Sequence, residues 1–413
     1  CGGEGFISFH LMRSIKYHFL FWLGLNKLNT RQNKNVSSES GGNKHRGMLI
    51  SLEAGRKPCN QIYQMRCDMF FEKNPYPERS YPIEQIPSTV PNEYQSAQIE
   101  RKFGMFIHFG INTFNNTEWS NGKLPVDSYR PSAIDAEQWI GTAYEAGMNY
   151  VVLITKHHDG FCLWDTDTTE YSVNYSPVKT DVVKAVSEAC KKYGVKLGLY
   201  YSLWDRHEKC YSDDEKYVEY MLRQLSELTD GRYGEVVELW LDGGWEKACR
   251  QWGLDRIYNL VKTNQPQCQI GVNITIGKYK ETKAAADKTY LPEKYRYGDP
   301  ISMFPSDFRL WDPHMCRADD PKVYTFNGKE YYMPFEYTIC SRSSGNWFYS
   351  DTYERKPLMD VDKVAENCKT LFDAQNLAVI NLPPNKDGRL VGGDIENLMK
   401  LSEKLGIRRE VKK

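Results

Sequence analysis

The sequence has no excess of charge of either sign and no apolar run long enough to cross a membrane. Lys plus Arg equals Asp plus Glu at 54 each over 413 residues. No electrostatic footprint therefore indicates nucleic acid or an anionic membrane as a partner. An apolar aromatic stretch at 17–25 is too short for a transmembrane span. These absences favour a neutral ligand and predict neither nucleic-acid binding nor a membrane-spanning helix.

Metal and phosphate signatures are missing too. The 11 Cys residues form no CxxC pair, no HExxH motif is present, and no glycine-rich loop follows the first predicted strand. Most cysteines are therefore interpreted as small buried apolar residues, and any disulfide pairing stays open because it depends on geometry. We expect no metal and no cofactor.

The first 90 residues are poorly patterned. The apolar stretch at 17–25 precedes a polar run rich in Asn, Ser, Gly and Lys. It could be the remnant of a signal sequence, an amphipathic anchor, or a leader that does not fold with the rest, and the last interpretation is favoured. We therefore expect a leader or extension at 1–90 and a catalytic domain at 91–413. Cys1 would suit a lipid anchor.

From about residue 91 onward, short apolar runs alternate with amphipathic segments, the pattern of repeated βα units. The pattern predicts an α/β fold, a (β/α)8 TIM-like barrel without a full C-terminal β-sandwich domain. Strands are expected at 104–108, 150–155, 196–201, 236–242, 269–273, 307–312, 337–340 and 377–381. Helices are expected at 136–146, 182–193, 217–228, 252–264, 361–373 and 395–405.

In such barrels, functional side chains gather at the carboxyl ends of the strands. The fourth predicted strand ends at Asp242, which follows an apolar run and precedes Gly243 and Gly244. A strand-end Asp often caps the next helix, but the helix here begins several residues later. Asp242 is therefore favoured as a catalytic carboxylate.

Histidines follow two other strands. His108 ends the first strand, where taken alone it is more typical of a satisfied core group. His157 and His158 follow the second strand; because successive side chains alternate, one should face the cavity and the other its rim. Metal binding by this pair is rated below sugar binding, since no local metal motif surrounds it.

A hydrolase that cleaves an acetal needs a second carboxyl group near the first. The candidates downstream are Asp307, Asp312 and Glu336, each near a predicted strand end. The sequence alone does not measure their distances from Asp242.

Several motifs then occur in an order that resembles the α-L-fucosidases of glycoside hydrolase family 29. They cover most of the chain from residue 91 to 405, and the ordered set is far more specific than any one of them. The motifs are 103–111 (FGMFIHFGI), 118–120 (EWS), 156–161 (KHHDGF), 198–202 (GLYYS), 240–243 (WLDG) and 381–388 (NLPPNKDG).

The resemblance implies a retaining exo-glycosidase that hydrolyses terminal α-L-fucosyl linkages of glycans by double displacement, with Asp242 as nucleophile. Its partner would be a fucosylated oligosaccharide or glycoconjugate, and its location periplasmic or extracellular. By the same resemblance, the residues that hold the sugar are His108, Glu118, Trp119, His157, His158, Tyr200, Trp240 and Trp347.

The acid/base region departs from the family pattern. The segment 306–312 is similar to the stretch that ends in the family's catalytic glutamate, which makes Asp312 the first choice and Glu336 the reserve. Arg309 or Arg342 would take the place of a missing arginine. Two alternatives stay open: the same fold acting on a related L-sugar linkage, and a non-catalytic fucose-binding protein.

Overall fold

A computed structural model gives the structure of the protein. It describes residues 83–247, 251–273, 303–311, 321–342 and 346–410. In this part of the chain no helix is both long enough and apolar enough to pass through a bilayer.

Eight strands form one sheet in which all the paired neighbours are parallel, in the order β5-β4-β3-β2-β1-β10-β9-β6. A parallel bridge between Gly271 and Phe308 and a 2.7 Å hydrogen bond from Asp307 N to Ile270 O join the two ends of this order. The sheet therefore curls into the predicted (β/α)8 barrel. The strands are β1 (Phe103–Ile107), β2 (Tyr150–Lys156), β3 (Lys196–Ser202), β4 (Val236–Asp242), β5 (Gln269–Val272), β6 (Arg309–Trp311), β9 (Phe335–Cys340) and β10 (Leu377–Asn381).

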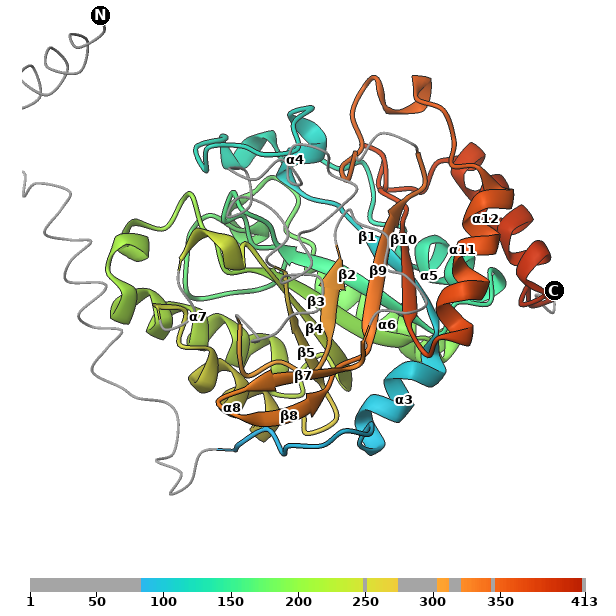
Figure 1. Ribbon diagram of the computed structural model, residues 1–413. Helices are drawn as coiled ribbons and strands as arrows, with labels where there is room; N and C mark the ends of the chain where they lie inside the picture. Colours follow the sequence, from blue (N-terminus) through green and yellow to red (C-terminus); the bar gives the residue numbers. More distant parts are fainter. Residues whose placement is uncertain (1–82, 248–250, 274–302, 312–320, 343–345, 411–413) are drawn as a thin grey trace, which may run out of the picture. The chain divides into compact units, whose positions relative to one another are not determined.

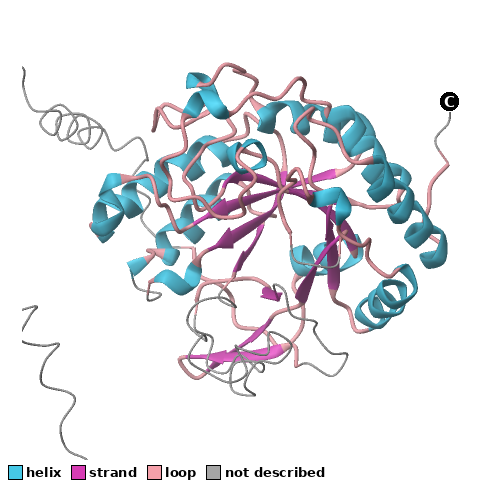
Figure 2. Cartoon of the chain, turned by 90° about the horizontal axis from the view of Figure 1, so that it is seen from above, coloured by secondary structure: helices cyan, strands magenta, loops and turns pink. Residues whose placement is uncertain are grey.

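Helices surround the strands, as the view from above shows (Figure 2). Several begin at an aspartate whose side chain accepts a hydrogen bond from a backbone N–H of the first turn, as Asp181 does for α6 and Asp360 for α11. The helices α6 and α11 lie where the amphipathic pattern predicts them. The helices are α3 (Glu93–Arg101), α4 (Ile111–Phe114), α5 (Ala136–Glu145), α6 (Val182–Tyr193), α7 (Asp214–Thr229), α8 (Leu254–Asn264), α11 (Val361–Asp373) and α12 (Gly392–Leu405).

The helices α3 and α4 lie at opposite ends of the barrel (Figure 1). Helix α3 precedes β1 and contacts the start of β4, where Gln98 Nε2 donates to Glu238 Oε2 at 3.1 Å. Helix α4 follows β1 and so lies at the carboxyl ends of the strands.

The strand periodicity of two divides the apolar residues into two cores. Alternate residues of β2, such as Tyr150, Val152 and Ile154, pack inside the barrel. Their neighbours Val151 and Leu153 pack outward against the helices. On β4 the same alternation places Glu238, Trp240 and Asp242 on one face, in three successive layers.

Along the chain, β6 and β9 are separated by an antiparallel hairpin. Its strands are β7 (Val323–Phe326) and β8 (Lys329–Tyr332). The sequence analysis did not predict it, although Asn327 and Gly328 form its turn and both have positive φ. Asn-Gly between two short strands is a strong hairpin signal for that reason.

Gly388, in the motif after β10, has φ +69°, and a Cβ there would overlap the carbonyl oxygen of Ala133. We predict that Gly388→Ala lowers the free energy of unfolding by about 3 kcal/mol, from the left-handed backbone plus overpacking. Gly406→Ala is the matched control, because Gly406 also has φ +69° but no neighbour within 4 Å. In urea unfolding, the control should lose only about 1 kcal/mol of the free energy of unfolding. Equal losses for the two variants would contradict the close packing of Gly388 against Ala133.

Candidate active site

A pocket opens at the carboxyl ends of the strands. Its empty space of about 340 Å³ includes the open solvent at its mouth. The lining residues are Phe106, His108, Trp119, His157, His158, Tyr200, Trp240, Asp242 and Trp347.

Asp242 ends β4 and is 6% exposed. Its Oδ2 accepts a hydrogen bond from the Tyr200 hydroxyl at 2.6 Å, and its Oδ1 accepts from Asn273 Nδ2 and Gly243 N, each at 2.9 Å. Gly243 has φ +81°, a conformation that favours glycine. The carboxylate is thus held from three directions while it still lines the pocket.

Burial raises the pKa of Asp242 to about 6, although the hydrogen bonds from Tyr200, Gly243 and Asn273 act to lower it. At neutral pH the group is therefore mostly ionised. An ionised, desolvated carboxylate with fixed hydrogen-bond donors is suited to act as a nucleophile.

His108 has a defined tautomer. Asn381 Nδ2 donates to Trp347 O at 2.9 Å, so its Oδ1 faces His108 Nδ1 at 2.7 Å. Nδ1 therefore carries the proton and Nε2 is an acceptor. Because burial lowers the pKa of His108 to about 3, the ring is neutral and can accept a hydrogen bond from a sugar hydroxyl.

Both histidines of the adjacent pair line the pocket, which differs in part from the expected split between cavity and rim. Strand β2 ends at Lys156, so the alternation of an extended strand no longer applies beyond it. His158 does face the rim, where its ring centroid is 5.2 Å from that of Trp119 and 5.0 Å from that of Trp204.

His158 is oriented by Ser202, whose hydroxyl donates to Trp204 O and lies 2.6 Å from His158 Nδ1. Nδ1 is therefore the donor, which leaves the lone pair of Nε2 3.5 Å from Asp242 Oδ2. Burial lowers the pKa of His158 to about 3, and that of His157 well below its usual value. Two acceptors thus face each other in the pocket, an arrangement suited to a ligand hydroxyl as donor.

Ligand atoms of His157, His158 and Asp242 all lie within 4.8 Å of one another, so these three side chains could also hold a metal ion. The oxygens of Asp242 already accept three hydrogen bonds from the protein. Sugar hydroxyls are equally well matched to this set of acceptors.

Glu118 lies beside the pocket and is not one of its lining residues. Its Oε2 accepts hydrogen bonds from the backbone N–H groups of Trp347 and Phe348 at 3.1 and 3.2 Å, and its chain neighbour Trp119 lines the pocket. Burial raises the pKa of Glu118 to about 7, against the lowering effect of these bonds and of Lys356. The group can therefore hold a proton at neutral pH.

Of the predicted acid/base candidates, the two that the structure describes, Asp307 and Glu336, do not line the pocket. Asp312 lies outside the described residues, so its role stays a prediction. Asp307 is paired with Lys262 at 2.7 Å and accepts from the Tyr258 hydroxyl at 2.9 Å, in a buried cluster beside β5. It does not line the pocket.

Glu336 lies near the start of β9, deep inside the barrel, and is fully buried. It accepts from Trp240 Nε1 at 2.9 Å and from the Tyr150 hydroxyl at 2.7 Å. Burial and the charge of Glu238 hold the pKa of Glu336 well above its usual range. It therefore supports the indole of Trp240 from below and is not itself a lining residue.

The two arginine candidates also lie away from the pocket lining. The Arg309 guanidinium lies 4.3 and 4.6 Å from the ring centroids of Tyr324 and Phe335. Arg342 pairs with Asp394 at 2.8 Å. Both contacts are structural.

The sequence analysis missed Asn273 and Asn381 as site residues. Each is a polar residue directly at the end of a predicted strand, the same signal that marked Asp242, and each orients a residue of the pocket. Phe106 was missed because an apolar residue in an apolar strand carries no signal of its own.

A parallel barrel with a buried carboxylate, neutral histidines and aromatic walls at its open end is the arrangement expected of a glycoside hydrolase barrel. Comparison with known proteins agrees. The family model for α-L-fucosidase matches residues 73–409. The chain belongs to the α-L-fucosidase family.

Individual relatives support the assignment. Alpha-L-fucosidase 1 of Arabidopsis thaliana is 33% identical over 337 residues, covering 78% of this chain and 60% of the relative. Human plasma alpha-L-fucosidase is 30% identical over 192 residues, covering 37% and 40% of the two chains. The crystal structure of SpGH29 matches with a TM-score of 0.60 at 25% sequence identity. The match covers 78% of this chain and 69% of the SpGH29 chain. The chain thus spans about 60% of the length of the curated plant relatives it matches.

Removing the Tyr200 hydroxyl should raise the pKa of Asp242 further, because that hydroxyl stabilises the ionised form. For Tyr200→Phe we predict that the acidic limb of kcat/KM against pH moves upward from about 6, by roughly one pH unit. Tyr201→Phe is the control, since the Tyr201 hydroxyl contacts Lys156 and Gln224 instead. If the acidic limbs of both variants moved upward equally, or if that of Tyr200→Phe moved downward, the role of Tyr200 in stabilising ionised Asp242 would be refuted.

Proposed function

We propose that the protein is a retaining exo-glycosidase that removes terminal α-L-fucosyl residues from glycans. The observation that carries the proposal is the buried Asp242 carboxylate, mostly ionised at neutral pH and fixed by three donors in a pocket with aromatic walls. Membership of the α-L-fucosidase family supports the choice of sugar.

In the first step, an Asp242 oxygen attacks the anomeric carbon, the glycosidic bond breaks, and a glycosyl ester of Asp242 forms. The leaving oxygen takes up a proton from an acid. In the second step, water attacks the same carbon and releases the Asp242 carboxylate, while the group that gave up its proton in the first step takes a proton from the water. Because both steps occur with inversion, the product keeps the configuration of the substrate.

The pocket suits a 6-deoxy sugar. Neutral His108 and His158 offer acceptors to ring hydroxyls, while Phe106, Trp240 and Trp347 supply an apolar wall for the methyl-bearing face. The Phe106 and Trp240 ring centroids are 5.4 Å apart and those of Tyr200 and Trp240 are 5.5 Å apart. Packed aromatic rings of this kind fix the shape of the pocket before a ligand arrives.

The proton donor has two candidates. Asp312 stays a prediction from the sequence. Glu118 does not itself line the pocket, but its Oε2 accepts from the backbone of the pocket residue Trp347 and its chain neighbour Trp119 lines the pocket. It is favoured by this position, and burial raises its pKa to about 7.

The nucleophile is tested by trapping it. Incubation with 2-deoxy-2-fluoro-α-L-fucosyl fluoride should add one fluorofucosyl group to the peptide that contains Asp242, detected by mass spectrometry of a digest. Asp242→Asn should give no adduct. A label on another carboxylate, or none on an enzyme that turns over fucosides, would contradict the role of Asp242.

The acid is tested by the leaving group. For Glu118→Gln we predict a fall in kcat/KM of about 100-fold on an alkyl α-L-fucoside, whose leaving oxygen needs a proton, and a much smaller fall on α-L-fucosyl fluoride. The basic limb of the pH profile, expected near 7 for the wild type, should also disappear. Equal losses on both substrates would assign Glu118 to binding alone.

A further inference from the structure

Under the proposed function, Asp242 meets the anomeric carbon of a terminal fucose in the pocket, so the sugar to which that fucose is attached must lie towards the pocket mouth. Trp119 lies at the pocket mouth, because it lines the pocket and is 37% exposed. Among the described residues, few large apolar side chains are this exposed.

Two further tryptophans from two other loops surround Trp119. Its ring centroid is 5.5 Å from that of Trp204 with the planes at 87°, and 6.4 Å from that of Trp245 with the planes at 16°. Trp245 is buried, whereas Trp204 is half-buried. The exposed Arg206 places its guanidinium 5.0 Å from the centre of the Trp204 ring. Indoles of this kind pack against the C–H faces of sugars.

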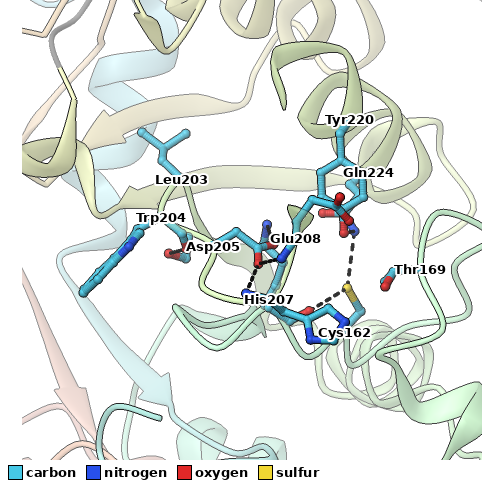
Figure 3. Close-up of polar contacts among 12 residues, drawn as sticks. Cys162, Thr169, Leu203, Trp204, Asp205, His207, Glu208, Tyr220 and Gln224 are labelled. Carbon is cyan, nitrogen blue, oxygen red and sulfur yellow. Dashed lines mark hydrogen bonds and ion pairs between the residues drawn. The ribbon is translucent and has the colours of Figure 1, made fainter. Parts of the chain in front are cut away.

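The loop that carries Trp204 and Arg206 is anchored from inside. Asp205, between them, is 2% exposed. Its Oδ1 accepts from His207 N and Glu208 N at 2.9 and 2.8 Å, as Figure 3 shows. Its Oδ2 pairs with the fully buried Lys156 Nζ at 2.9 Å. In Figure 3 the Trp204 indole points away from the cluster of Cys162 and Gln224.

Glycines of two neighbouring loops allow this loop to approach closely. A Cβ on Gly160 would lie 2.5 Å from Asp205 Oδ1, and one on Gly243 would lie 2.7 Å from Trp204 Cβ. Both glycines have positive φ. The loop is therefore packed closely against the segments that follow β2 and β4.

The same loop is hydrogen-bonded to the backbone of two residues that line the pocket. Leu203 N donates to Asp242 O at 2.7 Å, and Arg206 N donates to His158 O at 2.9 Å. Arg206 Nη1 donates to Ser120 O at 2.6 Å, and an arginine has five N–H donors in all. The position of the rim is thus fixed relative to both Asp242 and the pocket wall.

We propose that Trp119, Trp204 and Arg206 form a leaving-group subsite, which binds the pyranose ring to which the terminal fucose is attached. The proposal rests on the proposed function and adds to it a preference for sugar leaving groups. The indoles pack against the apolar face of that ring, and Arg206 donates hydrogen bonds to its hydroxyls. The subsite adjoins the pocket through Trp119, which lines both, and it differs from the pocket in that it binds the leaving group.

The test compares two substrates that share fucose but differ in the leaving group. One is α-L-fucosyl fluoride, which has no second ring, and the other is the best of a panel of fucosyl-galactose and fucosyl-N-acetylglucosamine disaccharides. For Trp204→Ala, kcat/KM on the disaccharide should fall about tenfold more than on the fluoride. Arg206→Ala should show a differential loss of about fivefold.

Trp204→Phe keeps an aromatic face and should restore most of the disaccharide activity. The control is Tyr175→Ala, an aromatic residue that is 58% exposed and does not line the pocket, and its losses on the two substrates should be equal. Equal losses for Trp204→Ala, or a wild type that cleaves the fluoride but no disaccharide, would overturn the subsite. A wild type inactive on the fluoride would instead reject the proposed function.

Discussion

The site depends on keeping one carboxylate ionised in a place where water is largely excluded. Burial alone would push Asp242 towards its neutral form, and the donors Tyr200, Asn273 and Gly243 N limit that shift. Each donor comes from a different position around the barrel mouth: β3, the residue after β5, and the turn after β4. The parallel sheet is what brings them together, because all its strands end on the same side.

The layers beneath support this arrangement. Trp240 lies one inward position below Asp242 on β4, and its indole nitrogen is bound by Glu336 from across the barrel. Tyr150 holds the other oxygen of Glu336. Glu336, a candidate acid in the sequence analysis, thus accepts a hydrogen bond from Trp240 and holds that indole at the base of the pocket. Its raised pKa follows from burial beside Glu238 and does not mark it as the proton donor.

Much of the fold could be predicted from the sequence, because strand and helix periodicities are local. The strand at 236–242, the helix at 182–193 and the polar residues that end the strands were placed correctly. The sequence analysis began the penultimate barrel strand at 337, whereas β9 begins at Phe335. That difference of two residues decides whether Glu336 lies outside the strand or deep inside the barrel.

What the sequence could not provide is contact between loops that are distant along the chain. The loop with Trp204 and Arg206 is fixed by Lys156 and by the close approach of Gly160 and Gly243. None of these contacts follows from periodicity or from a motif. Likewise, the raised pKa of Glu118 results from burial beneath the loop that carries Trp347 and Phe348, and that burial is a property of the folded chain alone.

The stereochemistry of the first product formed tests the central claim most directly. Hydrolysis of an α-L-fucoside followed by proton NMR should show α-L-fucose first, with the β anomer growing in later by mutarotation, because two displacements at the anomeric carbon restore its configuration. If β-L-fucose appeared first, water would be the attacking group, and Asp242 could not be the nucleophile.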